Sequence, residues 1–542
     1  MDLMGDSARF EGSRAAAHEG ARLLRLGDLD RAEAPLRAAA SDGERSAANN
    51  LGVLLHQSGR GHEAAEWWRI AAVAGSAPAA HALGRHHRER GDETAAEYWL
   101  RQAAECGHAS GAYALGDLLD HRGAPEAGQW FRTAAESGHR EAAYRYACLL
   151  AERGDETAEP WFRQSAARGH RRAALRLGAL LEARGEAEEA GRWYLAAAEA
   201  GEVRAASALG FLLRDAGDAA GAEGWWRRAA REGDGPAANA LGALHAERGE
   251  RQEAQRWYAA ALEAGDINGA FNLALLCSAQ GRTAQAEQWY RRAAYAGHRE
   301  ASNALAVLLL QRGDAAGAEP WFSKAAEAGS VDAAFNLGIL HAGRDETAQA
   351  RRWYEQAAAA GHAEAALQLA VELLREGEQR KAEPRLRQAA EGGSVEGAFR
   401  LAVLLERGGR AEAAEPWLAR AAEQGHRRAQ VRLGMVAAAA GDIVTAARWY
   451  RAAAEAGSPN GAFNLGLLLA REGSEPEAAL WWTRAAEAGH GRAALRLALL
   501  ASRRGDLAGG GTWCTRAMEL GPPEVAERAA RLRDALRQEL TA

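Results

Sequence analysis

A tryptophan recurs at an almost constant interval along nearly the whole chain, and this period limits what the chain can fold into. Between successive members the sequence number rises by 32 at most steps, by 31 at two, and by 64 at one, which passes over Arg385. The series is Trp67, Trp99, Trp130, Trp161, Trp193, Trp225, Trp257, Trp289, Trp321, Trp353, Trp417, Trp449, Trp481 and Trp513. With Pro35 as an earlier member, it defines 16 units over residues 13–521. A fixed period of this length is typical of repeat arrays, so we expect one array and not several domains.

Each unit has the pattern of two helices. In the unit around Trp481, apolar residues over 461–472 follow the period of an amphipathic helix, and a second helical pattern covers 475–488. A glycine follows the first helix in 15 of the 16 units, with Asp345 as the exception, and a glycine follows the second helix in all 16, from Gly43 to Gly521. Glycine readily takes the left-handed conformation that ends helices. The sequence therefore predicts an all-α fold, an α-solenoid of about 16 stacked helix-turn-helix hairpins of about 32 residues.

Small residues and the two ends of the array add detail to this prediction. A leucine followed by glycine or alanine recurs in the first helix, as in Leu51-Gly52, and predicts a close approach of the second helix. We expect residues 1–12 to be a disordered lead and residues 522–542 to form a C-terminal capping helix. Three consecutive glycines, Gly509 to Gly511, predict that the last second helix starts late or forms poorly.

Composition argues against several classes of protein. There are 67 Lys and Arg against 73 Asp and Glu, with no long basic run, so we expect no nucleic-acid partner. No stretch approaches about 18 uncharged apolar residues, which predicts no membrane insertion. The segment from Met1 to Arg14 carries three acidic residues and lacks the apolar core of a secretion signal. The 4 cysteines are far apart, which indicates neither disulfides nor a zinc site and fits the cytoplasm. Abundant Ala, Gly and Arg hint at a GC-rich bacterial genome.

A resemblance to known repeat families rests on particular residues. The run Trp481-Trp482-Thr483-Arg484-Ala485-Ala486-Glu487-Ala488-Gly489-His490, followed by Ala493 and Leu497-Ala498, resembles the Sel1-like repeat, as does the run from Trp353 to His362. The order of Leu-Gly, alanine and aromatic positions also resembles the tetratricopeptide repeat. The unit is shorter than is usual in either family. The resemblance implies a right-handed superhelix, first helices along its concave side, and a role in binding proteins or peptides.

The sequence carries no motif for catalysis or for a cofactor. We find no phosphate-binding loop, dinucleotide fingerprint, nucleophile elbow or HExxH zinc motif, so we expect no enzyme activity and no cofactor. Seven histidines follow the glycine at the end of a second helix, and we expect each to interact with the free carbonyls of the helix that it follows. They are His108, His139, His170, His298, His362, His426 and His490.

The first helices supply the candidate binding residues. The residue just before the Leu-Gly or Leu-Ala pair faces the groove in tetratricopeptide superhelices, and asparagine there can hold a peptide backbone while arginine can bind a carboxylate. The candidates at this position are Asn50, Arg145, Arg176, Asn272, Asn336, Gln368, Arg400, Arg432, Asn464 and Arg496. Phenylalanines precede them in every second unit of the C-terminal part, and they are Phe271, Phe335, Phe399 and Phe463. These rings could anchor a partner or could pack between repeats, and both interpretations stay open.

A cluster of polar residues near the N-terminus stands apart. Arg85 and Asp117 occupy positions that are mostly aliphatic in other units. The cluster comprises His56, His81, Arg85, Arg88, Asp117, Asp120 and His121. A solvated group of ion pairs is the preferred interpretation, with a polar recognition patch and a metal site as alternatives, and we assign no metal ligand.

These features favour a non-enzymatic scaffold that binds a partner protein or an extended peptide in the groove lined by the first helices. One alternative is a regulatory sensor whose superhelix changes pitch on ligand binding. Another is a structural protein that assembles with itself. The oligomeric state is open.

Overall fold

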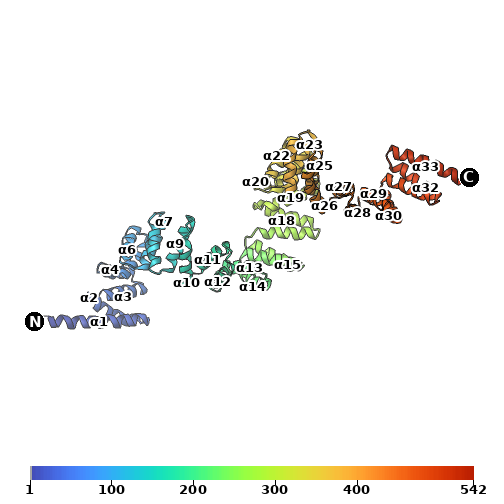
Figure 1. Ribbon diagram of the computed structural model, residues 1–542. Coiled ribbons are helices and arrows are strands. Elements are labelled where there is room, and N and C mark those ends of the chain that lie inside the picture. The colour runs from blue at the N-terminus through green and yellow to red at the C-terminus, as the bar shows by residue number, and fades with distance from the viewer. Residues whose placement is uncertain (1–2, 542) are drawn as a thin grey trace. The chain divides into compact units, whose positions relative to one another are not determined.

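The described part of the chain is helical. The computed structural model describes the backbone of residues 3–541 and the side chains of residues 12–540. Within that range there are 33 α-helices and no strand (Figure 1). The first and second helices of the repeats, here named A and B helices, alternate along the chain. Odd numbers from α1 to α31 are A helices, even numbers from α2 to α32 are B helices, and α33 follows. The prediction of an all-α repeat solenoid is thus confirmed.

Packing divides the array into two compact units. Unit 1 covers residues 1–280 and contains α1 to α17. Its A helices are α1 (Leu3–Arg25), α3 (Arg45–Gln57), α5 (Ala77–Glu89), α7 (Ala109–His121), α9 (Arg140–Glu152), α11 (Arg171–Ala183), α13 (Val203–Asp215), α15 (Gly235–Glu247) and α17 (Asn268–Ala279). Its B helices are α2 (Leu29–Ser41), α4 (Gly61–Val73), α6 (Glu93–Glu105), α8 (Ala127–Glu136), α10 (Ala158–Ala167), α12 (Ala187–Glu199), α14 (Ala219–Arg231) and α16 (Arg251–Glu263).

Unit 2 covers residues 281–542 and begins with a B helix. Its A helices are α19 (Arg299–Gln311), α21 (Val331–Ala342), α23 (Ala363–Arg375), α25 (Val395–Arg407), α27 (Arg427–Ala439), α29 (Pro459–Arg471) and α31 (Gly491–Arg503). Its B helices are α18 (Thr283–Tyr295), α20 (Ala315–Glu327), α22 (Thr347–Ala359), α24 (Gln379–Glu391), α26 (Ala411–Glu423), α28 (Ile443–Glu455), α30 (Glu475–Glu487) and α32 (Leu507–Leu520), and the last helix is α33 (Pro523–Thr541). Within each unit every hairpin packs on the next in chain order. A single array over residues 13–521 stays a prediction.

The core of each hairpin lies where the small residue of the A helix meets the second residue of the Trp pair. A Cβ atom on Gly210 would lie 2.4 Å from the ring of Trp226, and one on Gly52 would lie 2.5 Å from the ring of Trp68. Both rings are buried. The predicted close approach is therefore confirmed, because an indole from the B helix occupies the space that a side chain on the glycine would need. Where the A helix has alanine, as at Ala402, the same register holds a smaller residue, Leu418, which is also buried.

The glycines end the helices as predicted, with one exception. Thirty of them have positive φ angles between 69° and 95°, and Asp345 takes the same left-handed conformation at φ 60° where the series lacks a glycine. Gly521 differs, with φ −88° and ψ 155°. The residue after it is Pro522, and a residue before proline is restricted to extended conformations. The series of glycines in the left-handed conformation therefore ends with Gly505, in the last repeat.

Helices lie at both ends of the array. Residues 3–12 belong to α1, and residues 1 and 2 of the expected disordered lead lie outside the described residues. Ala17 and Leu23 of this helix are buried in a core cluster with residues of the following helices, so α1 packs on the array. The last B helix, α32, is complete and begins at Leu507 because the side chain of Asp506 accepts a hydrogen bond of 2.8 Å from the amide of Gly509.

Helix α33 packs on the last repeat, and we call it the cap helix. Its Val525, Ala529 and Leu536 are buried against α31 and α32. A Cβ atom on Gly510 would lie 3.0 Å from Leu536, so this glycine makes room for the cap. In the other B helices the corresponding residue is a buried alanine, such as Ala478. The three glycines therefore do not prevent α32 from forming, and Gly510 leaves room for α33 to pack against this helix.

Candidate partner-binding face

The candidate polar residues all lie on A helices, and most stand one position before a buried leucine of the hairpin core. We call this surface the A-helix face. Most of these side chains are half-buried, whereas Arg176 and Arg496 are exposed. Among the described side chains, Asn50, Gln368 and Asn464 form no hydrogen bond within the chain. Their amides therefore keep a donor and an acceptor available at the surface.

Two of the candidate asparagines link neighbouring A helices. Asn272 of α17 donates a hydrogen bond of 2.7 Å to the Oδ1 atom of Asn239 on α15. Asn336 of α21 donates one of 3.2 Å to the Oδ1 atom of Asn303 on α19. The sequence interpretation missed Asn239 and Asn303, although each stands 33 residues before its partner.

The candidate arginines fall into two groups. Arg145 pairs with Asp120 at 2.6 Å, Arg400 with Glu396 at 2.6 Å, and Arg432 with Glu406 at 2.6 Å. In the described part of the chain, Arg176 and Arg496 form no ion pair. A carboxylate of the chain neutralises the charge of each paired arginine, so among these candidates Arg176 and Arg496 present an uncompensated charge.

Three of the four candidate phenylalanines pack between repeats. Phe335, Phe399 and Phe463 stack on the histidine that begins the next A helix, with ring centroids 4.3–4.4 Å apart. Phe399 is buried with 5% of its surface exposed, whereas Phe271, Phe335 and Phe463 are half-buried. Phe399 therefore contributes to the contact between repeats and has little surface left for a partner.

The side chains of the seven histidines after the B helices cap the following A helix, whereas their backbone amides donate to carbonyls of the helix that precedes them, as from His139 to Ala134 at 3.0 Å. In each of the seven, the side chain accepts a hydrogen bond from the backbone three residues later, as from Ala142 to Nδ1 of His139 at 3.2 Å. The ring of His139 also stacks on Tyr113 of α7 at 4.6 Å. Since a backbone amide can only donate, Nδ1 must be unprotonated. Burial lowers the pKa of His108, His139 and His490, which favours that state.

The N-terminal polar cluster separates into an ion-pair network and a group of histidines. Arg88 of α5 pairs with Asp117 of α7 at 2.8 Å, and Arg145 of α9 approaches Asp117 at 3.8 Å and Asp120 at 2.6 Å. The network thus joins three A helices, in agreement with the preferred interpretation. Arg85 pairs with Glu89 within its own helix at 3.3 Å.

Two histidines of the cluster, His56 and His81, contact different rings. His56 and His86 flank the ring of Trp68, at 5.5 Å and 6.4 Å. His81 lies 4.9 Å from His108, and burial lowers the pKa of His81 to about 4. His121 is exposed. Over residues 12–540, no group of three or more His, Cys, Asp or Glu side chains is placed to hold a metal ion.

A ladder of ion pairs joins B helices to the ends of the A helices that follow them, and it was not predicted. We call it the B-helix ladder. A glutamate just before the recurring tryptophan pairs with an arginine 25 residues later, as Glu223 does with Arg248 at 2.8 Å. The hydrogen bond from Arg248 lowers the pKa of Glu223, which also pairs with Arg227 on its own helix. The same spacing recurs along the chain and could have revealed the ladder.

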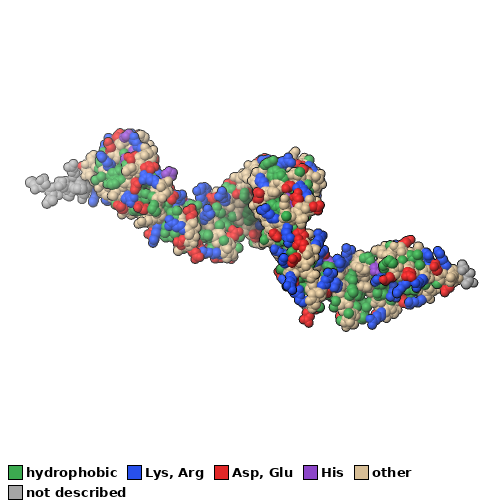
Figure 2. Space-filling model, turned by 90° about the horizontal axis from the view of Figure 1, so that it is seen from above, with side chains coloured by type: hydrophobic (Ala, Val, Ile, Leu, Met, Phe, Trp, Pro, Cys, Tyr) green, Lys and Arg blue, Asp and Glu red, His purple; other side chains and the backbone are tan. Residues whose placement is uncertain are grey.

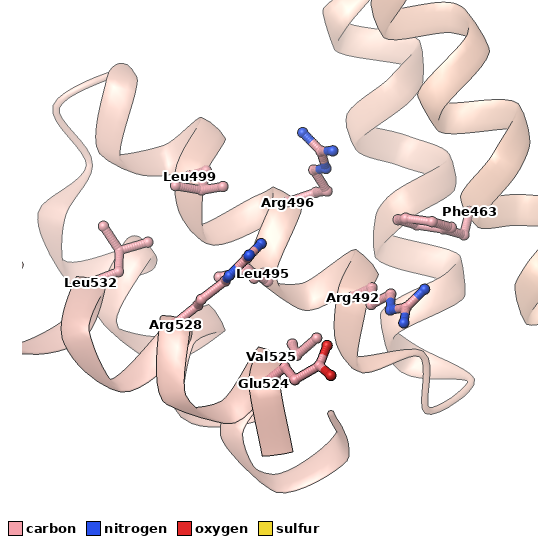
Figure 3. A pocket seen from close by; sticks show the side chains of 9 residues that line it. All are labelled: Phe463, Arg492, Leu495, Arg496, Leu499, Glu524, Val525, Arg528 and Leu532. Carbon is pink, nitrogen blue, oxygen red and sulfur yellow. The ribbon is translucent and has the colours of Figure 1, made fainter. Parts of the chain in front are cut away.

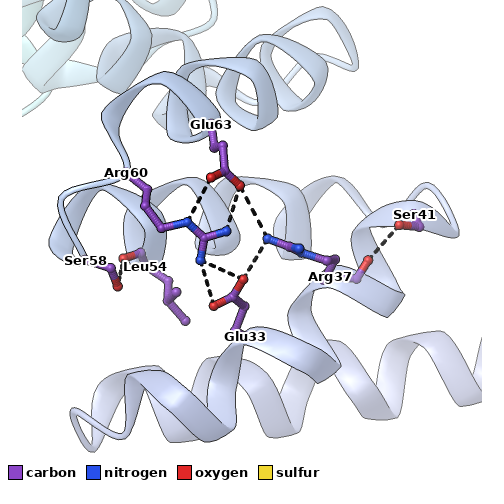
Figure 4. Close-up of polar contacts among 7 residues, drawn as sticks. All are labelled: Glu33, Arg37, Ser41, Leu54, Ser58, Arg60 and Glu63. Atoms are coloured by element: carbon purple, nitrogen blue, oxygen red, sulfur yellow. Dashed lines mark hydrogen bonds and ion pairs between the residues drawn. The ribbon is translucent and has the colours of Figure 1, made fainter.

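A variant of the ladder lies at the start of the array. Figure 4 shows α2 and α4, where Arg60 joins Glu33 and Glu63. Arg60 reaches Glu33 at 2.9 Å and Glu63 at 2.7 Å. One guanidinium group thus links two successive B helices.

A pocket of about 380 Å³ lies where the cap meets the last A helices (Figure 3). Phe463 comes from α29, Arg492, Leu495, Arg496 and Leu499 from α31, and Glu524, Val525, Arg528 and Leu532 from α33. Only Arg496 and Phe463 of this set were candidates from the sequence. The others escaped notice because the sequence does not show where the cap packs.

The surface and the helices limit the kinds of contact that the chain can make. Figure 2 shows positive and negative side chains interspersed over the visible face. Among the helices described, none combines the length and the apolar character that crossing a bilayer would require.

Comparisons with known proteins agree with this architecture. The family model of the tetratricopeptide repeat matches residues 203–228, 268–292, 300–323, 331–356 and 427–452, and a second model of the same repeat matches residues 19–81 and 367–427. A search of the curated proteins finds no match.

Two solved bacterial structures are similar in sequence at about one residue in four. A protective antigen of uropathogenic Escherichia coli with an SLR fold is 25% identical, with a TM-score of 0.47, and the match covers 78% of this chain and 96% of that one. A Sel1 repeat protein from Oxalobacter formigenes is 26% identical, with a TM-score of 0.41, and the match covers 51% of this chain and 90% of that one.

Proposed function

Because the chain carries tetratricopeptide repeats, we propose that it is a non-enzymatic scaffold whose A-helix face binds an extended segment of a partner protein. The observation that carries the proposal is the set of half-buried amides on this face that are not used within the chain. Asn50, Gln368 and Asn464 each offer a donor and an acceptor at the same register of their helices. An extended backbone presents alternating donors and acceptors, which such amides can bind whatever the side chains of the partner.

Repetition makes weak contacts of this kind useful. One amide–backbone hydrogen bond contributes only about 1 kcal/mol, because it replaces bonds to water. Several along one face add up once the first is made, since the later ones form at a high effective concentration. We therefore expect affinity to depend on the number of A helices engaged.

The test is a quadruple alanine variant of the A-helix face in unit 2. It replaces Gln368 and Asn464, whose amides form no hydrogen bond within the described chain, together with Asn336 and Arg400, which bond to Asn303 and Glu396 on the same face. Phe399 stays in place because that ring is buried. Partners are first captured by crosslinking and identified by mass spectrometry, and the affinity of the purified partner is then measured for each variant. We expect the quadruple variant to lose binding while its circular dichroism stays helical.

The matched control carries the same types of change on B helices. It replaces Gln349, Arg352, Gln356 and Gln379 with alanine, which also removes three amides and one arginine from exposed positions. Binding should persist in this control. Equal loss in both variants, or retention in both, would overturn the assignment of the A-helix face.

A further inference from the structure

We propose that the pocket between α29, α31 and α33 binds an acidic segment of a partner protein, in which carboxylates alternate with apolar side chains. This inference rests on the proposed function and names one partner chemistry for one end of the array. The pocket is the place where the A-helix face meets the cap.

The charges in the pocket are unbalanced. Arg492, Arg496 and Arg528 line it together with a single carboxylate, that of Glu524 (Figure 3). Over the described side chains, none of the three arginines takes part in an ion pair. Elsewhere on the A helices, arginines such as Arg400 have a carboxylate at 2.6 Å. Three guanidinium groups with free N–H donors attract carboxylates and can bind them through paired hydrogen bonds.

The arginines are arranged across two elements. Arg492 and Arg496 are one helical turn apart on α31, and Arg528 comes from α33. A ligand that engages both helices must span the pocket, which selects a chain with more than one negative group. Since α33 is not part of the repeat, the repeats that the structure describes do not reproduce this arrangement.

The remaining lining is apolar and argues for a polypeptide ligand. Leu495, Leu499, Val525 and Leu532 and the half-buried ring of Phe463 surround the arginines. An inorganic anion would use the guanidinium groups and leave this surface in water. An acidic segment that also carries leucine or phenylalanine would use both, because burying an apolar side chain there removes apolar surface from water.

The experiment measures binding of a fluorescein-labelled peptide, Gly-Glu-Leu-Glu-Phe-Glu-Leu-Glu-Gly, to the full chain by fluorescence anisotropy. Two control peptides have all glutamates changed to glutamine or all apolar residues changed to serine. We expect the first peptide to bind at least about tenfold more tightly than either control. We also expect its binding to weaken when NaCl is raised from about 50 to about 300 mM, because salt screens the charges.

Two double variants with the same charge change locate the site. Arg496→Gln with Arg528→Gln should weaken binding of the acidic peptide by about tenfold or more, since each arginine supplies charge-assisted hydrogen bonds. Arg503→Gln with Arg516→Gln, both exposed outside the pocket, should change it by less than about twofold. Circular dichroism should be unchanged in both.

Several results would overturn the inference. They are equal effects of the two double variants, equal binding of the serine control, full competition by inorganic phosphate, or self-association of the chain that depends on Arg496 and Arg528. Failure here is separable from failure of the proposed function. The quadruple variant of the A-helix face keeps every pocket residue, and the pocket variant keeps Asn336, Gln368, Arg400 and Asn464.

Discussion

At the level of single residues, packing depends on matched sizes across each hairpin. Gly210 leaves space for Trp226, whereas Ala402 stands in the same register as the smaller Leu418. The three tryptophans at this position of the B helix, Trp68, Trp226 and Trp482, each face a glycine, whereas leucine is compatible with glycine, as at Gly84 and Leu100, and with alanine. Protein interiors tolerate an added methyl group poorly when no neighbour yields.

We predict that Gly210→Ala destabilises its hairpin by about 1–3 kcal/mol, because the new Cβ would overlap the buried indole. Gly224→Ala, on the neighbouring B helix, should instead stabilise by up to about 1 kcal/mol, since a Cβ there meets no atom within 4 Å. Hydrogen exchange of α13 and α14 measures both. Adding Trp226→Leu to Gly210→Ala should recover part of the loss, and a loss left unchanged would contradict the size matching.

The capping histidines make the hairpin junctions sensitive to pH. Burial holds the pKa of His139 below its ordinary value near 6.5, so between the two values the unfolded chain binds more protons than the folded one. Stability from this group is thus present above about pH 6.5 and is lost as the pH falls through the folded pKa. Protonation of Nδ1 would also break the bond from Ala142.

We predict that His139→Ser reduces this pH dependence. Serine caps the same position in other repeats, as Ser330 does through a bond of 3.2 Å from Ala333, and it does not titrate. Between pH 7.5 and pH 5.0, the protection factors of α9 amides, corrected for intrinsic exchange, should fall more in the wild type than in the variant. Equal falls would show that the cap does not titrate.

At the level of helices, the B-helix ladder is a set of ion pairs in which the positive and negative residues can exchange places. In several repeats a glutamate such as Glu223 pairs with two arginines, here Arg227 and Arg248. One repeat has the opposite charges at the same three positions. Arg351 there approaches Glu355 at 3.8 Å and Glu376 at 3.3 Å.

The reversed repeat gives a direct test. Glu223→Arg should destabilise the contact between α14 and the end of α15 by about 1 kcal/mol, since it places a third positive charge beside two arginines. Adding Arg227→Glu and Arg248→Glu should restore stability and copy the natural reversed set. Thermal denaturation at low and high salt measures the effect, which should shrink in salt. A triple variant no more stable than Glu223→Arg would show that the pairs contribute nothing.

The sequence predicts the helices well because local chemistry decides them. The left-handed glycines, the Leu-Gly positions and the aromatic pair are each fixed by a neighbour within one hairpin. The role of His139 could not be assigned from the sequence, because a residue in a turn can serve the helix on either side. The pocket arginines Arg492 and Arg528 belong to different helices, and only the packing of α33 brings them together.

For the whole molecule, stability should be local because, within each unit, the described hairpins pack chiefly on their neighbours in the chain. A core substitution should therefore weaken a few repeats and leave distant ones unchanged. Leu51 is fully buried in unit 1, and replacing it with alanine should cost about 2–5 kcal/mol where it lies.

We predict that Leu51→Ala speeds hydrogen exchange in α2 to α5 and leaves α21 to α29 at wild-type rates. The expected gradient follows from nearest-neighbour packing. Exchange measured by mass spectrometry at the peptide level resolves the two regions. Equal acceleration in both would show that the chain unfolds as one cooperative body.

The terminal pocket does not depend on how many repeats precede it. Every residue of the terminal pocket lies at or after Phe463, and the contacts that support it belong to the last hairpins and α33. Inserting or removing a block of two repeats earlier in unit 2 would shift only the numbering of these residues. Proteins with a different number of such repeats can therefore keep the same terminal pocket. What changes with repeat number is the number of amide positions on the A-helix face.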